Sequence, residues 1–155
     1  MADEERYGTR SLTYSAWHRI KSTCRFVGIE NAQRLAMIDV DHIIWVEYED
    51  ENKEPLALIE EAEDVGQNNK PSTVTRGLAQ RANLPAMLVL WKPSKSANPA
   101  SPDWPDIERF RVKRLWPLPQ SKWRELTPEA WASVLLRLRT WQAERLDREL
   151  FGDST

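Results

Sequence analysis

The sequence predicts an α/β protein in which helices cover a mixed β-sheet. Alternating apolar and polar residues, typical of strands, fill residues 35–62, and helical periodicity appears on both sides of them. A short apolar run at residues 86–91 follows the second helical segment, which is the order of a β-α-β unit. We expect a single domain over residues 11–151, behind a flexible tail at residues 1–10.

The first half of the chain is expected to form one helix and three strands. Apolar residues recur at three- and four-residue steps over Ser11–Val27, and Gly28 is placed to end that helix. Leu35–Asp50 is expected to form two strands with a bend near Asp41 and His42. A polar turn then leads to a third strand, Pro55–Ala62.

The middle of the chain is expected to form a loop, a helix and a central strand. Val65–Pro71 is polar, and Ser72 is a candidate N-cap for a helix that ends near Ala82. Ala86–Trp91 is continuously apolar, which suits a buried strand. Four prolines in residues 93–105 predict an exposed loop.

The last part is expected to form a strand and a long helix. Ile107–Trp116 alternates apolar residues with Arg109, Arg111 and Lys113, which predicts a strand with a basic face. Residues 118–126 look irregular. Thr127 is placed to cap the final helix, with Pro128 at its first position. The apolar stripe of that helix is predicted at Trp131, Val134, Leu135, Leu138 and Trp141.

Composition excludes several classes of protein. Hydrophobic residues make up 41% and charged residues 30% of the chain, and no apolar run is long enough to span a membrane. The polar N-terminus lacks the apolar core of a signal peptide. The single Cys24 excludes an internal disulfide and a cysteine-based zinc site. We therefore expect a cytoplasmic protein that has no membrane partner.

The net charge of −2 hides an uneven distribution. Residues 1–64 hold 15 acidic and 7 basic residues (net −8), and residues 65–155 hold 9 acidic and 15 basic residues (net +6). A basic second half beside an acidic cluster suits a phosphate ligand approaching a metal site. Charge complementarity within the protein explains the same distribution without a ligand.

Acidic residues alternate with apolar ones in the predicted strands. Asp39 and Asp41 lie within an apolar stretch, and the strand PLALI ends on Glu60. Acids on neighbouring strands can hold a hard divalent cation against a phosphate. The same alternation also describes an ordinary antiparallel sheet with one solvated face. Two aspartates within a strand favour a site, because Asp is depleted in strands.

The order of elements and the positions of the acids resemble the PD-(D/E)XK nuclease superfamily, in particular its small phage- and prophage-type members. The resemblance spans Tyr14–Trp91. It rests on a first helix with YSAWHR, the strand MIDVDHI with Asp41, the hairpin into PLALIE with Glu60, and the helix TRGLAQRANLP leading into AMLVLW. It implies a restriction-endonuclease-like α-β-β-β-α-β core, followed here by a C-terminal helix.

The resemblance also implies roles for particular residues. In that superfamily the strand Asp and the following Glu bind Mg²⁺, which places Mg²⁺ or Mn²⁺ on Asp41 and Glu60, with Asp39 or Glu61 as a secondary ligand. The superfamily has a catalytic Lys two residues after the Glu, where this chain has Ala62. Lys70, on the loop before the second helix, is the candidate replacement.

We therefore expect a nuclease-like protein that binds nucleic acid, DNA rather than RNA, and hydrolyses phosphodiester bonds. The alternative is a nuclease fold without catalysis that binds nucleic acid or a protein, for example as an inhibitor of a host system. Ala62 and the acidic segment Glu60–Asp64 favour that alternative. Eight Trp residues and the long last helix would also suit an assembly subunit. The candidate substrate-binding residues are His18, Arg19, Arg76, Arg109, Arg111 and Lys113.

Overall fold

The computed structural model describes residues 12–38 and 40–152. The chain divides into two compact units, residues 1–39 and 40–155, where the sequence predicts one domain from residue 11. In the described part of the chain, no helix has the length and apolarity needed to cross a membrane. The predicted tail at residues 1–10 lies outside the described residues.

The described part of the N-terminal unit contains three short helices: α2 (Leu12–His18), α3 (Ile20–Val27) and α4 (Ile29–Ala32). The single helix predicted over this region is broken at Arg19, whose backbone is extended with φ −66° and ψ 154°. Gly28 ends α3 as predicted, at a φ of +81° that glycine adopts without steric cost.

The C-terminal unit is built on a mixed five-stranded sheet, which confirms the predicted class. The strands run in the order β1-β2-β3-β4-β5. Only β2 and β3 are parallel, and they are joined through a helix as the β-α-β pattern predicts. The strands are β1 (His42–Glu47), β2 (Lys53–Glu63), β3 (Ala86–Asn98), β4 (Ser101–Trp116) and β5 (Arg124–Leu126).

The prediction of two strands within Leu35–Asp50 is wrong. Within its described residues only His42–Glu47 is a strand, so two strands rather than three precede the second predicted helix. The sheet ladder stops at the pair His42 and Ile59. Just beyond it, the Asp41 carboxylate accepts a hydrogen bond from the Glu61 amide at 2.9 Å. The Asp41 side chain thus pairs with the Glu61 amide, which a residue of a longer β1 strand would otherwise have to accept.

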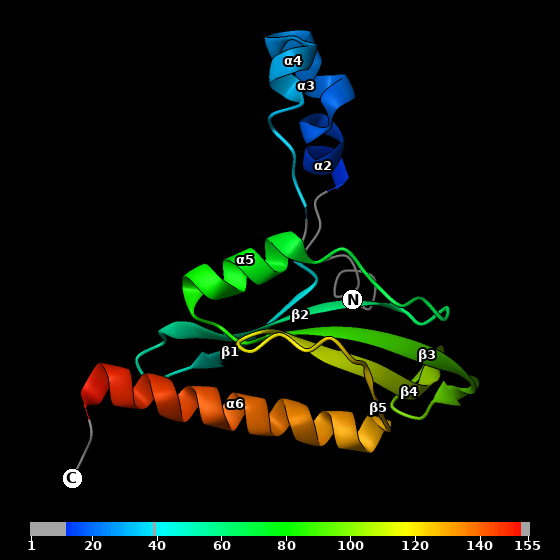
Figure 1. Cartoon of the computed structure of the whole chain (residues 1–155), viewed down its shortest axis with the longest axis vertical. Helices are drawn as coiled ribbons and strands as arrows, with labels where there is room; N and C mark the ends of the chain where they lie inside the picture. The colour runs from blue at the N-terminus through cyan, green and yellow to red at the C-terminus, as the bar shows by residue number, and fades with distance from the viewer. Residues whose placement is uncertain (1–11, 39, 153–155) are drawn as a thin grey trace. The chain divides into compact units, whose positions relative to one another are not determined.

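Helices α5 (Thr73–Ala82) and α6 (Pro128–Phe151) cover opposite faces of the sheet, as Figure 1 shows. Side chains alternate along each strand, so neighbouring residues enter different cores. The core on the α5 side contains Leu58, Ala79, Leu84, Ala86, Leu88 and Leu115. The core on the α6 side contains Ile59, Met87, Val89, Val112 and Trp131.

The predicted ends of both helices are largely confirmed. Ser72 precedes α5 without a capping hydrogen bond from its side chain, whereas the Thr127 hydroxyl accepts the Ala130 amide at 3.1 Å. The predicted stripe of α6 is confirmed only as far as Leu138. Trp141 is 47% exposed, and Gln142 is the fully buried residue at that level of the helix.

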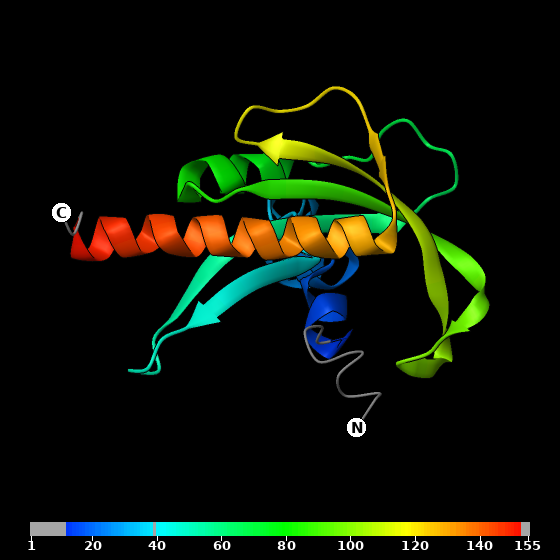
Figure 2. The ribbon, with the colours of Figure 1, turned by 90° about the horizontal axis from the view of Figure 1, so that it is seen from below.

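The exposed loop predicted at residues 93–105 is instead part of a two-stranded ribbon. Strands β3 and β4 run on beyond the rest of the sheet, and Figure 2 shows the ribbon curling away from it. Pro93 is paired with Ile107, and Ala97 with Pro105, with register shifts between these pairs. Prolines are tolerated here because, among the described residues, each strand of the ribbon has one edge without a partner strand, so a residue there needs no amide to donate to a neighbour.

Candidate functional site: a lysine between two carboxylates

Lys70 brings together the two acids singled out in the sequence. Asp41 directly precedes β1, Glu60 lies in β2, and Lys70 lies in the loop between β2 and α5. The Lys70 Nζ is 2.9 Å from Glu60 Oε2 and 3.6 Å from Asp41 Oδ2. One cationic group therefore contacts both carboxylates.

The surrounding polar groups hold the two carboxylates in place. Glu60 is only 5% exposed, and its Oε1 accepts a hydrogen bond from the Thr75 hydroxyl at 2.5 Å. Asp41 is more open, and its Oδ2 accepts the Glu61 amide. The buried acid thus has a partner for each oxygen, as a charge out of water requires.

Electrostatics keep Asp41 and Lys70 charged at neutral pH. Partial burial would raise the pKa of Asp41, but the hydrogen bond from the Glu61 amide and the Lys70 charge outweigh it and lower that pKa. Burial would likewise lower the pKa of Lys70, but the hydrogen bond to Glu60 and the two negative charges raise it. Lys70 is therefore a cation here and cannot accept a proton near neutral pH.

Two carboxylates of the cluster are of the kind that can ligate a hard divalent cation. Mg²⁺ in proteins is commonly held by one or two carboxylates and keeps several water ligands. Asp41 and Glu60 supply two carboxylates that already converge on one ammonium nitrogen. Among the described residues no group of three or more acidic, His or Cys side chains lies close enough to share a metal ion. Asp39, the other secondary candidate, lies outside the described residues.

Glu61 does not extend this set, contrary to its predicted role as a secondary ligand. Its carboxylate accepts a hydrogen bond from the Trp91 indole and lies 3.8 Å from His42 Nε2. Consecutive residues of a strand point to opposite faces, so Glu61 is directed away from the face that Glu60 shares with α5. Only the backbone amide of Glu61 reaches the cluster.

The predicted substrate-binding residues are distributed over several elements. His18 and Arg19 belong to the N-terminal unit, where His18 Nε2 is 2.8 Å from the Leu35 carbonyl oxygen. Arg76 is exposed on α5, one residue after Thr75. Of these three, only Arg76 lies on an element that also contributes a contact to the acid cluster.

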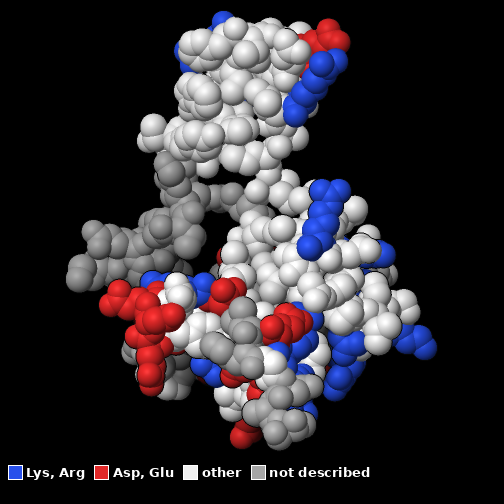
Figure 3. Space-filling model, turned by 90° about the vertical axis from the view of Figure 1, so that its left-hand side faces the viewer, with Lys and Arg blue, Asp and Glu red and all other residues white. Residues whose placement is uncertain are grey.

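The three basic residues of β4 have partners within the protein. Arg109 lies 3.6 Å from Glu125, and the Lys113 Nζ lies 4.6 Å from the centre of the Trp123 ring. Arg111 donates to both carboxylate oxygens of Asp64, at 2.8 and 2.7 Å. Figure 3 shows separate acidic and basic groups and no continuous basic surface on the face that it draws.

Sequence reasoning missed Thr75 and the pairing of Asp64 with Arg111. Thr75 is buried on the same side of α5 as Ala79. Its position four residues before that apolar residue is the sequence signal that could have placed it on the buried face of the helix. The pair of Asp64 and Arg111 is separated by 47 residues. No local pattern marks such a pair, because the register of distant strands determines it.

Comparison of the chain with protein-family models, with curated proteins and with solved structures found no match. The arrangement of acids, lysine and sheet described above is therefore what bears on function.

Proposed function

We propose that this protein is a divalent-metal-dependent phosphodiesterase that acts on nucleic acid, with Asp41, Glu60 and Lys70 at its centre. The observation that supports this proposal is the position of Lys70. Its ammonium reaches both carboxylates from a loop ten residues after Glu60, although Ala62 stands where the nuclease superfamily has its lysine.

In this proposal Asp41 and Glu60 hold Mg²⁺ or Mn²⁺, and Lys70 moves aside from the point at which the carboxylates converge. A bound ion would polarise the phosphate and lower the pKa of a water ligand. Thr75 fixes one oxygen of Glu60 and leaves the other to bind the cation. Lys70, still protonated, would stabilise the negative charge of the transition state.

Nucleic acid is the proposed substrate, with DNA favoured over RNA. Arg76 is exposed on the helix that supplies Thr75, and Lys113 lies on the strand next to β3. Contacts from such residues to phosphates would weaken as the salt concentration rises, because binding releases counterions. The two-stranded ribbon of β3 and β4 extends beyond the sheet and adds surface near the carboxyl end of β2.

A binding protein without catalysis is the second candidate, and one observation favours it. Both oxygens of Glu60 already have partners within the protein, and Lys70 offsets one of the two negative charges of the cluster. An ion network of this kind can simply stabilise the end of the sheet. The two candidates differ in one respect: only the phosphodiesterase requires the carboxylates to bind a metal ion.

The direct test is cleavage of plasmid DNA and of single-stranded RNA with Mn²⁺, with Mg²⁺ and with EDTA. The Glu60→Gln variant keeps the shape of the side chain and removes its charge. Glu63→Gln is the matched control, because Glu63 is an exposed residue of the same strand. We expect metal-dependent cleavage that Glu60→Gln abolishes and Glu63→Gln retains. Cleavage that persists in Glu60→Gln would reject the proposed centre.

Metal binding can be measured separately through the melting temperature. A ligand that binds only the folded state at ten times its Kd stabilises it by about 1.4 kcal/mol. We expect Mn²⁺ to stabilise the wild type and Glu63→Gln, but not Glu60→Gln. If no metal ion stabilises the wild type and no cleavage occurs, the binding-protein candidate is favoured. Salt-sensitive retention on DNA would then identify nucleic acid as its partner.

A further inference from the structure

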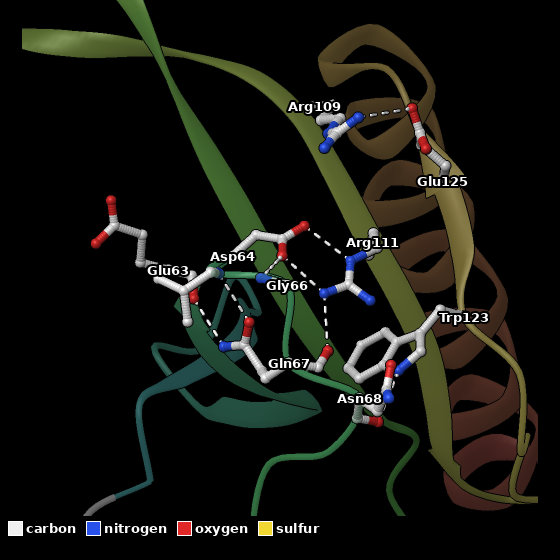
Figure 4. A network of polar contacts seen from close by, with 10 residues as sticks. Glu63, Asp64, Gly66, Gln67, Asn68, Arg109, Arg111, Trp123 and Glu125 are labelled. Carbon is white, nitrogen blue, oxygen red and sulfur yellow. Dashed lines mark hydrogen bonds and ion pairs between the residues drawn. The ribbon is translucent and has the colours of Figure 1, made fainter.

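We infer that Arg111 and Trp123 are positioning residues that hold the loop Asp64–Lys70 in the conformation that delivers Lys70 to Glu60. This concerns the conformation of the chain and can be tested without any activity. Its consequence for catalysis rests on the proposed function. Figure 4 shows the contacts that Arg111 and Trp123 make with this loop.

Arg111 ties the start and the middle of the loop to β4. Its Nε and Nη2 donate to the two oxygens of Asp64, at 2.8 and 2.7 Å, and Nη2 also donates to the Gln67 carbonyl at 2.8 Å. A bidentate arrangement of this kind fixes direction as well as distance. The guanidinium therefore determines where the loop leaves β2 and where it turns.

The loop wraps around Asp64 through its own hydrogen bonds. The Gly66 amide donates to Asp64 Oδ1 at 2.9 Å, and Gly66 adopts a φ of +85° in this turn. The Gln67 side chain accepts the Val65 amide and donates to the Glu63 carbonyl, both at 2.8 Å. Asp64 is thus the central acceptor of the turn, and Arg111 neutralises it.

Trp123 holds the loop closest to Lys70. Its indole Nε1 donates to the Asn68 carbonyl at 3.0 Å, two residues before Lys70. The Arg111 guanidinium lies 5.2 Å from the centre of the Trp123 ring, and the ring packs against the core on the α5 side. The Trp123 indole, held in place by the core, therefore fixes the position of the loop backbone at Asn68.

Burial distinguishes this pair from an ordinary surface ion pair. The side chains of Asp64 and Arg111 are 4% and 19% exposed, whereas those of Glu125 and Arg109 are 63% and 38% exposed. Surface ion pairs contribute little, but removing one partner of a buried pair leaves an uncompensated charge. Without these ties the loop would lose the order that places Lys70.

The test measures the accessibility of Lys70 itself, in the full chain and without metal or substrate. An amine-reactive acylating reagent is added, and mass spectrometry of peptides gives the labelling rate of each lysine. The variants are Trp123→Phe, which removes the indole donor, and Arg111→Lys, which removes the bidentate bond. The matched controls are Trp141→Phe, an exposed Trp that lies under Arg145, and Arg137→Lys, an exposed position on α6.

We expect Lys70 to react slowly in the wild type and both controls, since its amine is largely buried and paired with Glu60. It should react several-fold faster in Trp123→Phe and in Arg111→Lys, while the exposed Lys95 keeps its rate as an internal reference. Circular dichroism and melting curves establish that each variant is folded. Unchanged labelling of Lys70 in either folded variant would overturn the inference.

Cleavage kinetics then separate this inference from the proposed function. If the wild type cleaves DNA, both positioning variants should lower kcat more than they raise KM, because a misplaced Lys70 affects the transition state. A wild type that does not cleave would remove the catalytic consequence only. Faster labelling of Lys70 in the two variants would still establish the positioning of the loop.

Discussion

Lys70 and Glu60, ten residues apart in the chain, form an ion pair with 2.9 Å between Nζ and Oε2. The Lys70 side chain is 23% exposed and that of Glu60 6%. The loop between β2 and α5 thus folds back so that its Lys70 contacts Glu60 in β2, the strand that precedes the loop. This pair defines the candidate site, and its removal is the first prediction.

Replacing Lys70 with Met should destabilise the protein, because it leaves the buried Glu60 carboxylate without its charged partner. Loss of such a charged hydrogen bond costs about 1–3 kcal/mol. Urea unfolding measures this change in the free energy of unfolding. Lys95→Met is the control, since Lys95 is exposed on the ribbon.

Divalent metal should restore part of the stability that Lys70→Met loses, because a cation can then occupy the point between the carboxylates. At the same time the variant should lose cleavage activity in the proposed mechanism. Equal stability of Lys70→Met and Lys95→Met would show that the ion pair contributes nothing to folding.

The pair of Asp64 and Arg111 should make stability depend on pH in the acidic range. The hydrogen bonds from Arg111 lower the pKa of Asp64 from 3.8 to about 2. An acid with a lowered folded pKa contributes fully above its unfolded pKa, and the contribution is lost as the pH falls from 3.8 towards 2. Asp64→Asn should therefore cost on the order of 1–2 kcal/mol near neutral pH, and progressively less below about pH 4.

Urea unfolding of the wild type and Asp64→Asn at a series of pH values measures this difference. Asp103→Asn, at an exposed position of the ribbon, serves as the control and should follow the wild type throughout. A difference between the wild type and Asp64→Asn that stays constant down to about pH 2.5 would contradict the assignment of the lowered pKa to this pair.

The hydroxyl of Thr75 should matter more than its methyl group. Thr75→Val keeps the volume but removes the hydrogen bond to the buried Glu60, at an expected cost of about 1–3 kcal/mol. Thr75→Ser keeps the donor and should lose less. Melting curves of both variants, with the exposed Thr73→Val as a reference, provide the measurement. A more stable Thr75→Val than Thr75→Ser would argue that Thr75 only fills space.

Local patterns in the sequence predicted several elements well. The helix after Ser72, the apolar strand from Ala86 and the Thr127 cap depend on neighbouring residues, and the structure has all three. Among the described residues of 35–41 no strand forms, and the Asp41 side chain accepts the Glu61 amide at the end of the ladder. The loop expected at residues 93–105 forms a ribbon, because pairing between distant residues outweighs the local effect of proline.

The sequence by itself determined the mixed α/β class and the order of the β-α-β unit, since periodicity is a local property. Whether the two strands of that unit are parallel was decided by the tertiary structure. Only the tertiary structure decided which acids meet. It separates Glu61 from Glu60, brings Lys70 to both Asp41 and Glu60, and pairs Asp64 with Arg111. These contacts depend on the register of the strands and on the path of one loop, which are decided by packing across the whole sheet.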